Sequence, residues 1–238
     1  MTPQSRALPV ILTRPAAQGD RFAADLRARF GHQVAPILSP LLAPVFLPVE
    51  LPAGPFRAII LTSETGAQAA ARLSGLPRLA WCVGDRTAAA ARALGFDARS
   101  AAGDADALVA AVLASGDAGP FLHLRGRDSR GDVAARLTAA GMPTRDLVVY
   151  VQEPQPLNDQ ALAYLAGAEP VIVPLFSPRT AQLFAATAPK APLYIAALSP
   201  TVAQALGQLP RQMLSVAYRP DAAALLQALV PLIKAARA

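Results

Sequence analysis

Short apolar runs alternate with alanine-rich stretches along most of this chain, and this alternation limits the possible folds more than any other feature. The runs Leu8–Leu12 and Val171–Leu175 have the length and composition of buried strands. Residues 15–30, which follow the first run, have the signals of a helix, with proline in the first turn and Gly31 at the end. Strands that alternate with helices of this length predict parallel sheets covered by helices on both faces.

The same patterns predict the other elements, with one exception. Further strands are predicted at 56–61, 79–83, 121–124, 147–152, 193–197 and 213–217. Further helices are predicted at 65–73, 86–94, 104–114, 132–140, 158–165, 180–188, 200–207 and 221–235. The exception is residues 36–55, where prolines recur every few positions, so we expect an extended connector there rather than a core element.

Two strand-to-helix turns occur in similar form in both halves of the chain. The Leu-Thr-Ser phrase that ends at Ser63 is echoed by the Leu-Phe-Ser phrase that ends at Ser177. The Val-Gly-Asp phrase that begins at Val83 is echoed by Leu-Ser-Pro from Leu198. Such turns leave backbone N–H groups unpaired at a helix start, where the helix dipole favours an anion. Two matched sets therefore predict two similar α/β lobes that bind something negatively charged.

A third pair of strand ends carries arginine, at Arg14 and Arg125. A simple tandem repeat would divide the chain near residue 116. The proline-rich connector and the stretch 147–156 instead favour two crossings between interleaved lobes. We therefore expect one lobe from 1–36 and 154–238, a second from 50–148, and inter-lobe connector strands at 37–49 and 147–153.

The charged residues favour a small acidic ligand over nucleic acid or a metal, although a bias toward alanine, arginine and proline explains the charge equally well. The net charge is +6, and the arginines are scattered without a basic run. Cys82, the only cysteine, excludes an internal disulfide and is expected to be a buried, inert thiol. His32 and His123 lack metal-ligand spacing, and we expect a surface turn for the first and a structural role for the second.

The high hydrophobic content, 53%, does not predict a membrane span. The uncharged stretch of residues 33–49 contains four prolines, which an ordinary spanning helix would not carry. Residues 1–9 lack a basic segment followed by an apolar signal core. We therefore expect a cytoplasmic protein that binds neither membrane nor nucleic acid.

Short motifs spread over nearly the whole chain carry a resemblance to a known family. They are Leu12-Thr13-Arg14-Pro15 with Gln18, Leu61-Thr62-Ser63, Val83-Gly84 with Thr87-Ala88, Val149-Tyr150 before Pro154, Phe176-Ser177-Pro178 with Ala181, Ser199-Pro200-Thr201, and Pro220-Asp221 with Leu225. Together and in this order they resemble the uroporphyrinogen-III synthase family. The resemblance implies two flavodoxin-like parallel-sheet lobes with an interleaved chain, joined by a two-stranded connector.

The resemblance also implies a reaction that needs no cofactor. Hydroxymethylbilane, a linear tetrapyrrole with eight carboxylates, would lose water and close to uroporphyrinogen III with its last ring inverted, on the way to haem, sirohaem and cobalamin. Uncatalysed closure gives the non-inverted isomer, so the main task of such an enzyme is geometric. A preference of about 100-fold needs only roughly 2.7 kcal/mol of differential stabilisation. We expect a monomer that receives its substrate by transient hand-over from hydroxymethylbilane synthase.

The candidate substrate-binding residues lie at the predicted strand ends. They are Arg14, Thr62, Ser63, Gly84, Thr87, Arg125, Ser177, Ser199 and Thr201. Ordinary helix capping is the alternative role for the hydroxyls, and a tight turn is the alternative for Gly84. Tyr150 is the candidate acid that helps hydroxide to leave, with packing against the connector as its alternative. Arg127, Asp128 and Arg130 are expected to form a solvated loop with mutual ion pairs.

Three residues depart from the family pattern, and two other functions stay open. Glu64 would oppose an anionic substrate if it pointed inward, Ser199 replaces a frequent glycine, and Val202 replaces a common threonine. One alternative is a non-catalytic two-lobe binder of tetrapyrroles or other polycarboxylates, which would bind without turnover. The other is a periplasmic-type binding protein, which the expected lack of a signal peptide disfavours.

Overall fold

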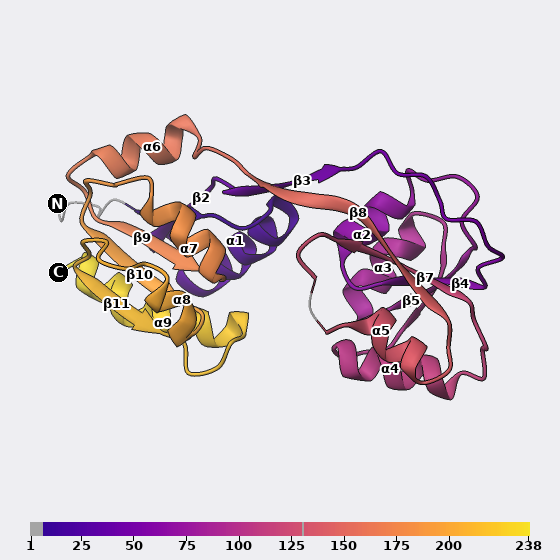
Figure 1. Ribbon diagram of the computed structural model, residues 1–238. Coiled ribbons are helices and arrows are strands. Elements are labelled where there is room, and N and C mark those ends of the chain that lie inside the picture. Colours follow the sequence, from indigo (N-terminus) through magenta and orange to yellow (C-terminus); the bar gives the residue numbers. More distant parts are fainter. Residues whose placement is uncertain (1–6, 130) are drawn as a thin grey trace. The chain divides into compact units, whose positions relative to one another are not determined.

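The computed structural model describes residues 7–129 and 131–238, which divide into two compact units (Figure 1). Unit 1 comprises the described part of Met1–Ala43 together with Pro154–Ala238, and unit 2 comprises Pro44–Glu153. The chain therefore passes from one unit to the other twice, after Ala43 and after Glu153. Each unit is built around one sheet.

The sheet of unit 1 contains five parallel strands. They are β1 (Leu8–Leu12), β2 (Val34–Leu38), β9 (Val171–Leu175), β10 (Leu193–Ala197) and β11 (Met213–Val216). Their order across the sheet is β11-β10-β9-β1-β2. Counted along the chain, this is the 2-1-3-4-5 order of the flavodoxin-like fold, which reverses direction between β1 and β9.

Helices cover both faces of this sheet. One face packs against α1 (Ala16–Phe30) and α9 (Ala222–Ala236), through a buried cluster that includes Phe22 and Leu229. The other face packs against α6 (Asp159–Ala166), α7 (Pro178–Ala185) and α8 (Pro200–Gln204), through a cluster that includes Phe184. Because β1 and β9 lie between these layers, all of their residues are buried, which explains their unbroken apolar sequences.

The sheet of unit 2 contains six strands. They are β3 (Leu42–Phe46), β4 (Ala58–Leu61), β5 (Leu79–Cys82), β6 (Asp97–Ser100), β7 (Phe121–Gly126) and β8 (Thr144–Pro154). Their order is β3-β8-β7-β4-β5-β6, and β4 to β8 pair in parallel. Counted from β4, this is the 3-2-1-4-5 order of dinucleotide-binding folds, so the order reverses between β4 and β7.

Two pairs of helices enclose this second sheet. Helices α2 (Glu64–Ala70) and α3 (Asp85–Ala93) pack on the face that buries Leu61 and Leu124. Helices α4 (Ala105–Ala114) and α5 (Val133–Ala139) pack on the face that buries Ile60 and Phe121. The predicted α/β class with two mainly parallel sheets is therefore confirmed.

The predicted connector at 36–55 is wrong in part, because its first residues belong to β2, with Ile37 in the core. β3 lies within the connector strand expected at 37–49. Both strands lie at a sheet edge, where the missing N–H groups of Pro36 and Pro44 leave no central ladder broken. The edge strand β6 was also not predicted, because its sequence is polar and only Ala98 is buried.

Two remaining expectations concern membrane spans and the cysteine. Within residues 7–129 and 131–238, no helix is long and apolar enough to cross a bilayer. The prediction of a buried Cys82 is confirmed, since its side chain is inaccessible at the end of β5. Burial raises the pKa of the Cys82 thiol to about 11, which keeps it in the unreactive protonated form.

Candidate functional site

A pocket of about 450 Å³ lies at the carboxyl ends of the strands in unit 2. Its lining includes residues from the turns after β4 and β7, from the N-terminus of α4 and from β8, among them Thr62, Ser63, Asp104, Gly126, Asp128 and Tyr150. Strands β4 and β7 are the neighbours at which the strand order reverses. Doubly wound sheets bind ligands at such a point, so this pocket is the candidate active site.

Tyr150 reaches the pocket because strand β8 is irregular. Arg125 of β7 pairs with Val148, whereas the next residue, Gly126, pairs with Tyr150. The residue passed over, Val149, forms a bulge, and an extra residue exchanges the faces on which later side chains lie. The bulge therefore places Tyr150 on the same face as Gly126, where its hydroxyl lies 3.0 Å from Ser63 Oγ.

Gly126 provides the space that the Tyr150 ring occupies. A Cβ atom at position 126 would lie 2.7 Å from Cζ and 2.8 Å from Cε2 of this ring. Separations this short are not tolerated between carbon atoms, and both atoms belong to a rigid aromatic ring that is itself largely buried. Glycine at position 126 is therefore a requirement for the observed position of Tyr150.

Ser63 connects this tyrosine to the start of α2. It is the N-cap of the helix, and its Oγ accepts a hydrogen bond of 2.9 Å from the Gly66 backbone N–H. An oxygen that accepts from Gly66 still carries its own proton, which it can donate to the phenolic oxygen of Tyr150. The phenol can then donate its proton into the pocket.

Thr62, the preceding residue, points to the other face of the sheet. Its Oγ1 lies 3.3 Å from Nε2 of His123, a residue only 1% exposed. The other ring nitrogen of His123, Nδ1, lies 2.8 Å from a carboxylate oxygen of Asp146. Burial lowers the pKa of His123 below its ordinary value, and the Asp146 carboxylate opposes this effect only in part.

Arg125 is occupied by partners within the protein. Its Nε lies 3.1 Å from Asp146 Oδ2, and its Nη1 donates to the carbonyl oxygens of Gly126 and Arg127. These contacts fix the end of β7 against β8. Arg125 is not among the described lining residues of the pocket, and its predicted role as a carboxylate ligand stays a prediction.

The charged side chains among the described lining residues of the pocket are acidic. Among its described residues, Asp104 and Asp128 carry charge and none is a cation, whereas Glu64 is not part of the lining. The pKa of Asp104 is lowered, chiefly because the Ala107 N–H donates to its carboxylate. The expectation of an anion site at this turn stays a prediction. The predicted loop cation Arg130 lies outside the described residues.

Comparison with known proteins decides the family. A family model described as uroporphyrinogen-III synthase HemD matches residues 20–227. The chain belongs to the uroporphyrinogen-III synthase family. No curated protein matches it. It is similar to the crystal structure of uroporphyrinogen-III synthetase from Helicobacter pylori, with 17% identity over 95% of this chain and 99% of the other and a TM-score of 0.64. A mutant uroporphyrinogen III synthase from Thermus thermophilus matches with 15% identity over 96% and 100% of the chains and a TM-score of 0.46.

In this member of the uroporphyrinogen-III synthase family, the two other candidate residues of unit 2, Gly84 and Thr87, lie at the start of α3. Gly84 is the N-cap of α3, and its neighbour Val83 lines the pocket. Thr87 is buried within the helix, with 5% of its surface exposed. The suggestion that Thr87 caps α3 is therefore wrong, because the helix already begins two residues earlier, at Asp85.

The predicted residues of unit 1 lie at the carboxyl ends of its strands. Ser177 and Ser199 are the N-caps of α7 and α8, which confirms their capping role. Thr201 is exposed in the first turn of α8. The guanidinium of Arg14 stacks 3.9 Å above the ring centroid of Phe176, across the point where the strand order of this sheet reverses. Substrate contact by Arg14, Ser177, Ser199 and Thr201 stays a prediction.

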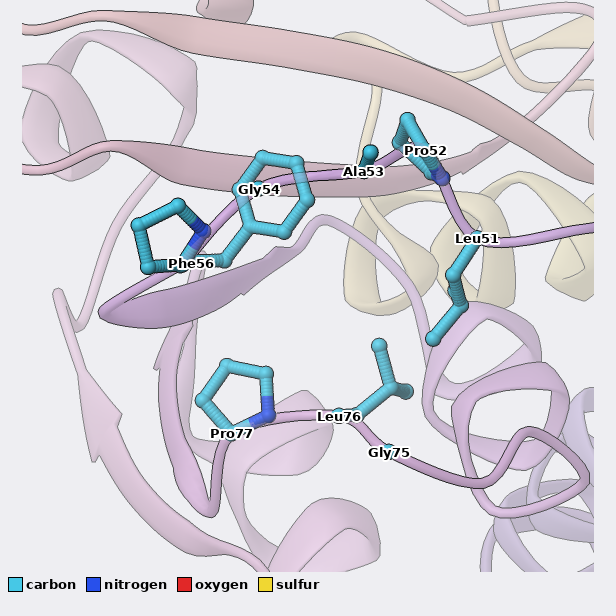
Figure 2. Close-up of a pocket in the computed structure, with 9 residues that line it drawn as sticks. Leu51, Pro52, Ala53, Gly54, Phe56, Gly75, Leu76 and Pro77 are labelled. Atoms are coloured by element: carbon cyan, nitrogen blue, oxygen red, sulfur yellow. The ribbon is translucent and has the colours of Figure 1, made fainter.

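A second pocket, of about 420 Å³, lies at the opposite edge of the unit 2 sheet, before β4 and β5. Figure 2 shows Leu51 and Leu76 pointing toward one another across it, with Phe56 alongside. Its described lining residues are apolar or glycine, so none can transfer a proton or pair with a charge. Within residues 7–129 and 131–238 there is also no group of three metal-ligating side chains.

Sequence reasoning missed two features of the site. One is the space that Gly126 leaves for the Tyr150 ring, and the other is the pair formed by His123 and Asp146. The turn containing Gly126 was recognised, but its steric role depends on the bulge at Val149. The pairing of His123 with Asp146 depends on the register between β7 and β8, in which these residues are direct partners.

We predict that Gly126→Ala displaces the Tyr150 ring, because the new methyl group would overlap it. The expected cost is about 1–3 kcal/mol of unfolding free energy, measured by urea denaturation. The variant Tyr150→Leu lacks the ring atoms involved. Gly126→Ala should therefore cost much less in the Tyr150→Leu background, and equal costs in both backgrounds would contradict this packing.

We predict that stability falls as the pH drops below 6.5, the ordinary pKa of histidine. With its pKa lowered by burial, folded His123 holds fewer protons than unfolded His123 in this range, so acid favours the unfolded chain. His123→Gln should flatten the pH dependence. The control is His32→Gln, at an exposed residue of the short helix Gly31–Gln33. A slope that survives His123→Gln but disappears with His32→Gln would refute the assignment.

Proposed function

We propose that this protein is a uroporphyrinogen-III synthase, which closes hydroxymethylbilane to uroporphyrinogen III with inversion of the last ring and loss of water. The observation that carries the proposal is the Tyr150 hydroxyl, hydrogen-bonded to Ser63 in the pocket at the switch point of unit 2. Membership of the family supplies the substrate class.

The charge of the pocket suits the first chemical step. When the hydroxymethyl group of a pyrrole loses hydroxide, the lone pair of the ring nitrogen is drawn toward the electron-deficient carbon that remains. The ring thereby becomes electron-poor and positively charged. Carboxylates such as that of Asp104, an exposed residue at the start of α4, attract a cation that develops beside them. We assign the reacting end of the substrate to this pocket, and its carboxylates to helix starts and arginines elsewhere.

The leaving hydroxide requires a proton, and Tyr150 is placed to give it. In the proposed step the C–O bond breaks with both electrons on oxygen, the Tyr150 proton moves to that oxygen, and water leaves. The phenolate left behind is stabilised by the Ser63 hydroxyl, which is oriented by the Gly66 N–H. When the closed ring regains its aromatic form, the proton that it releases returns to the phenolate.

Selection of the inverted isomer requires the alternative carbon of the last ring to be held out of reach. Unit 1 offers Arg14, Ser177, Ser199 and Thr201 as proposed partners for its carboxylates, through side chains and helix-start N–H groups. The energy required is small, because 100-fold selectivity needs only roughly 2.7 kcal/mol. The reaction is that of a lyase, since a C–O bond breaks with loss of water.

A coupled assay tests the proposal. Hydroxymethylbilane is formed in place from porphobilinogen by its synthase, this protein is added, and the oxidised porphyrin isomers are separated by chromatography. We expect isomer III to dominate. Isomer I alone, from a protein shown to be folded by circular dichroism, would contradict the proposal and favour a non-catalytic tetrapyrrole binder.

We predict that Tyr150→Phe lowers kcat by about ten- to 100-fold, because it removes the proton donor and keeps the ring. Ser63→Ala should have a smaller effect, and the double variant should lose little more than Tyr150→Phe, because both residues act on one proton. Tyr218→Phe is the matched control, since Tyr218 is an exposed residue of unit 1. An unchanged kcat in Tyr150→Phe would remove this residue from the mechanism.

We also propose that the protein acts as a cytoplasmic monomer that receives hydroxymethylbilane by transient hand-over from hydroxymethylbilane synthase. A single buried cysteine requires no oxidising compartment, and direct transfer would limit spontaneous closure to isomer I. Sedimentation velocity should show the mass of one chain at micromolar concentration. A stable dimer under these conditions would contradict this proposal.

A further inference from the structure

A chain of polar groups, with the buried imidazole of His123 at its centre, lies behind the pocket and has no part in the steps described above. It runs from Thr62 Oγ1 through the ring of His123 to Asp146, with separations of 3.3 and 2.8 Å. The second oxygen of Asp146 pairs with Arg125 Nε at 3.1 Å. Thr62 lines the pocket, whereas the side chain of His123 is only 2% exposed. These hydrogen-bonded groups therefore connect a buried imidazole to one hydroxyl of the candidate site.

The direction of each hydrogen bond follows from the chemistry of the groups. An ionised carboxylate can only accept, so His123 Nδ1 must carry the hydrogen that is shared with Asp146. In a neutral imidazole the other nitrogen is then a bare acceptor. Thr62 must therefore donate its hydroxyl hydrogen to Nε2 of His123. Burial supports the neutral form, because it lowers the pKa of His123.

We propose that His123, held in one tautomer by Asp146, is a positioning residue that makes Thr62 Oγ1 a hydrogen-bond acceptor for a pyrrole N–H of the substrate. This inference rests on the proposed function. The single hydrogen of the Thr62 hydroxyl is committed to His123, so only the oxygen lone pairs are available to a ligand. A tetrapyrrole offers N–H groups as donors, and the N–H of the electron-poor ring becomes the strongest of them.

The hydroxyls of Tyr150 and Thr62 thus have opposite tasks in one pocket. Tyr150 donates a proton to the leaving oxygen, whereas Thr62 accepts from the ring nitrogen that becomes positive. A threonine hydroxyl without a fixed partner can rotate and can donate as well as accept. A hydrogen directed at the cationic ring would oppose the reaction. Holding the hydroxyl in one orientation before the substrate arrives therefore favours the transition state.

The Arg125 contact makes Asp146→Asn a sharp test. Arg125 Nε can only donate, so the one oxygen of an asparagine at position 146 should remain with Arg125. The amide NH2 group then faces His123 Nδ1, which must become an acceptor. The hydrogen moves to Nε2, which donates to Thr62, and the Thr62 hydrogen turns toward the pocket. One substitution should thus reverse the polarity of Thr62 without removing a side chain.

Nitrogen NMR can read the tautomer directly. The chain has two histidines, so a His32→Gln background leaves His123 as the only imidazole. With ¹⁵N-labelled histidine, we expect the Nδ1–H tautomer in this background and the Nε2–H tautomer after Asp146→Asn. An Nε2–H tautomer or a protonated ring at pH 7.5 without the Asp146→Asn change would overturn the inference, as would a tautomer that Asp146→Asn leaves unchanged.

The coupled isomer assay measures how the substitutions change catalysis. Asp146→Asn should lower kcat roughly tenfold with little change in KM, the effect of one hydrogen bond made mainly in the transition state. Thr62→Val should show a similar loss, and Thr62→Ser should retain most of the activity because it keeps the hydroxyl. Urea unfolding of each variant separates these effects from loss of fold.

Different results would refute the role of His123 and the proposed function. Isomer III from the unmodified protein, with kcat unchanged in both Asp146→Asn and Thr62→Val, would refute the role of His123 and leave the proposed function intact. Isomer I alone from the unmodified protein would refute the proposed function, and with it the acceptor role of Thr62 toward a pyrrole.

Discussion

The parallel pairing of β4 with β7 at the centre of unit 2 is the constraint on which the candidate site depends. It places Ile60 beside His123 and Leu61 beside Leu124, so the turn that follows β4 lies next to the end of β7. The strand order reverses between these two strands, which leaves room for a ligand beyond their carboxyl ends. A shift of one residue in this register would move His123 away from Thr62 and Tyr150 away from Ser63.

Successive residues after β4 serve opposite faces of the sheet, and this alternation explains how one turn takes part in two networks. Thr62 points toward His123 on one side, and Ser63 points toward Tyr150 on the other. The bulge in β8 is necessary for the second contact, because regular alternation would place Tyr150 on the face of Asp146. The site is thus built from strand geometry, and its loops complete it.

Much of the fold could be predicted from the sequence, because buried parallel strands are unbroken apolar runs and their helices begin with serine, aspartate or proline. The prediction failed at sheet edges, where the proline of β2 and the polar residues of β6 conceal the strands. At the site, Ser63 and Tyr150 could be singled out as turn and crossing residues. Their contact, the need for glycine at position 126 and the pairing of His123 with Asp146 depend on register and on a bulge, which no local pattern specifies.

A crystal structure of the protein with uroporphyrinogen III, grown without oxygen, tests the central claim most directly. The account predicts one pyrrole of the product in the pocket of unit 2, with its N–H within hydrogen-bond distance of Thr62 Oγ1 and the Tyr150 hydroxyl facing the adjacent bridging carbon. A product that contacts neither residue, or one that places its carboxylates against Asp104, would contradict it.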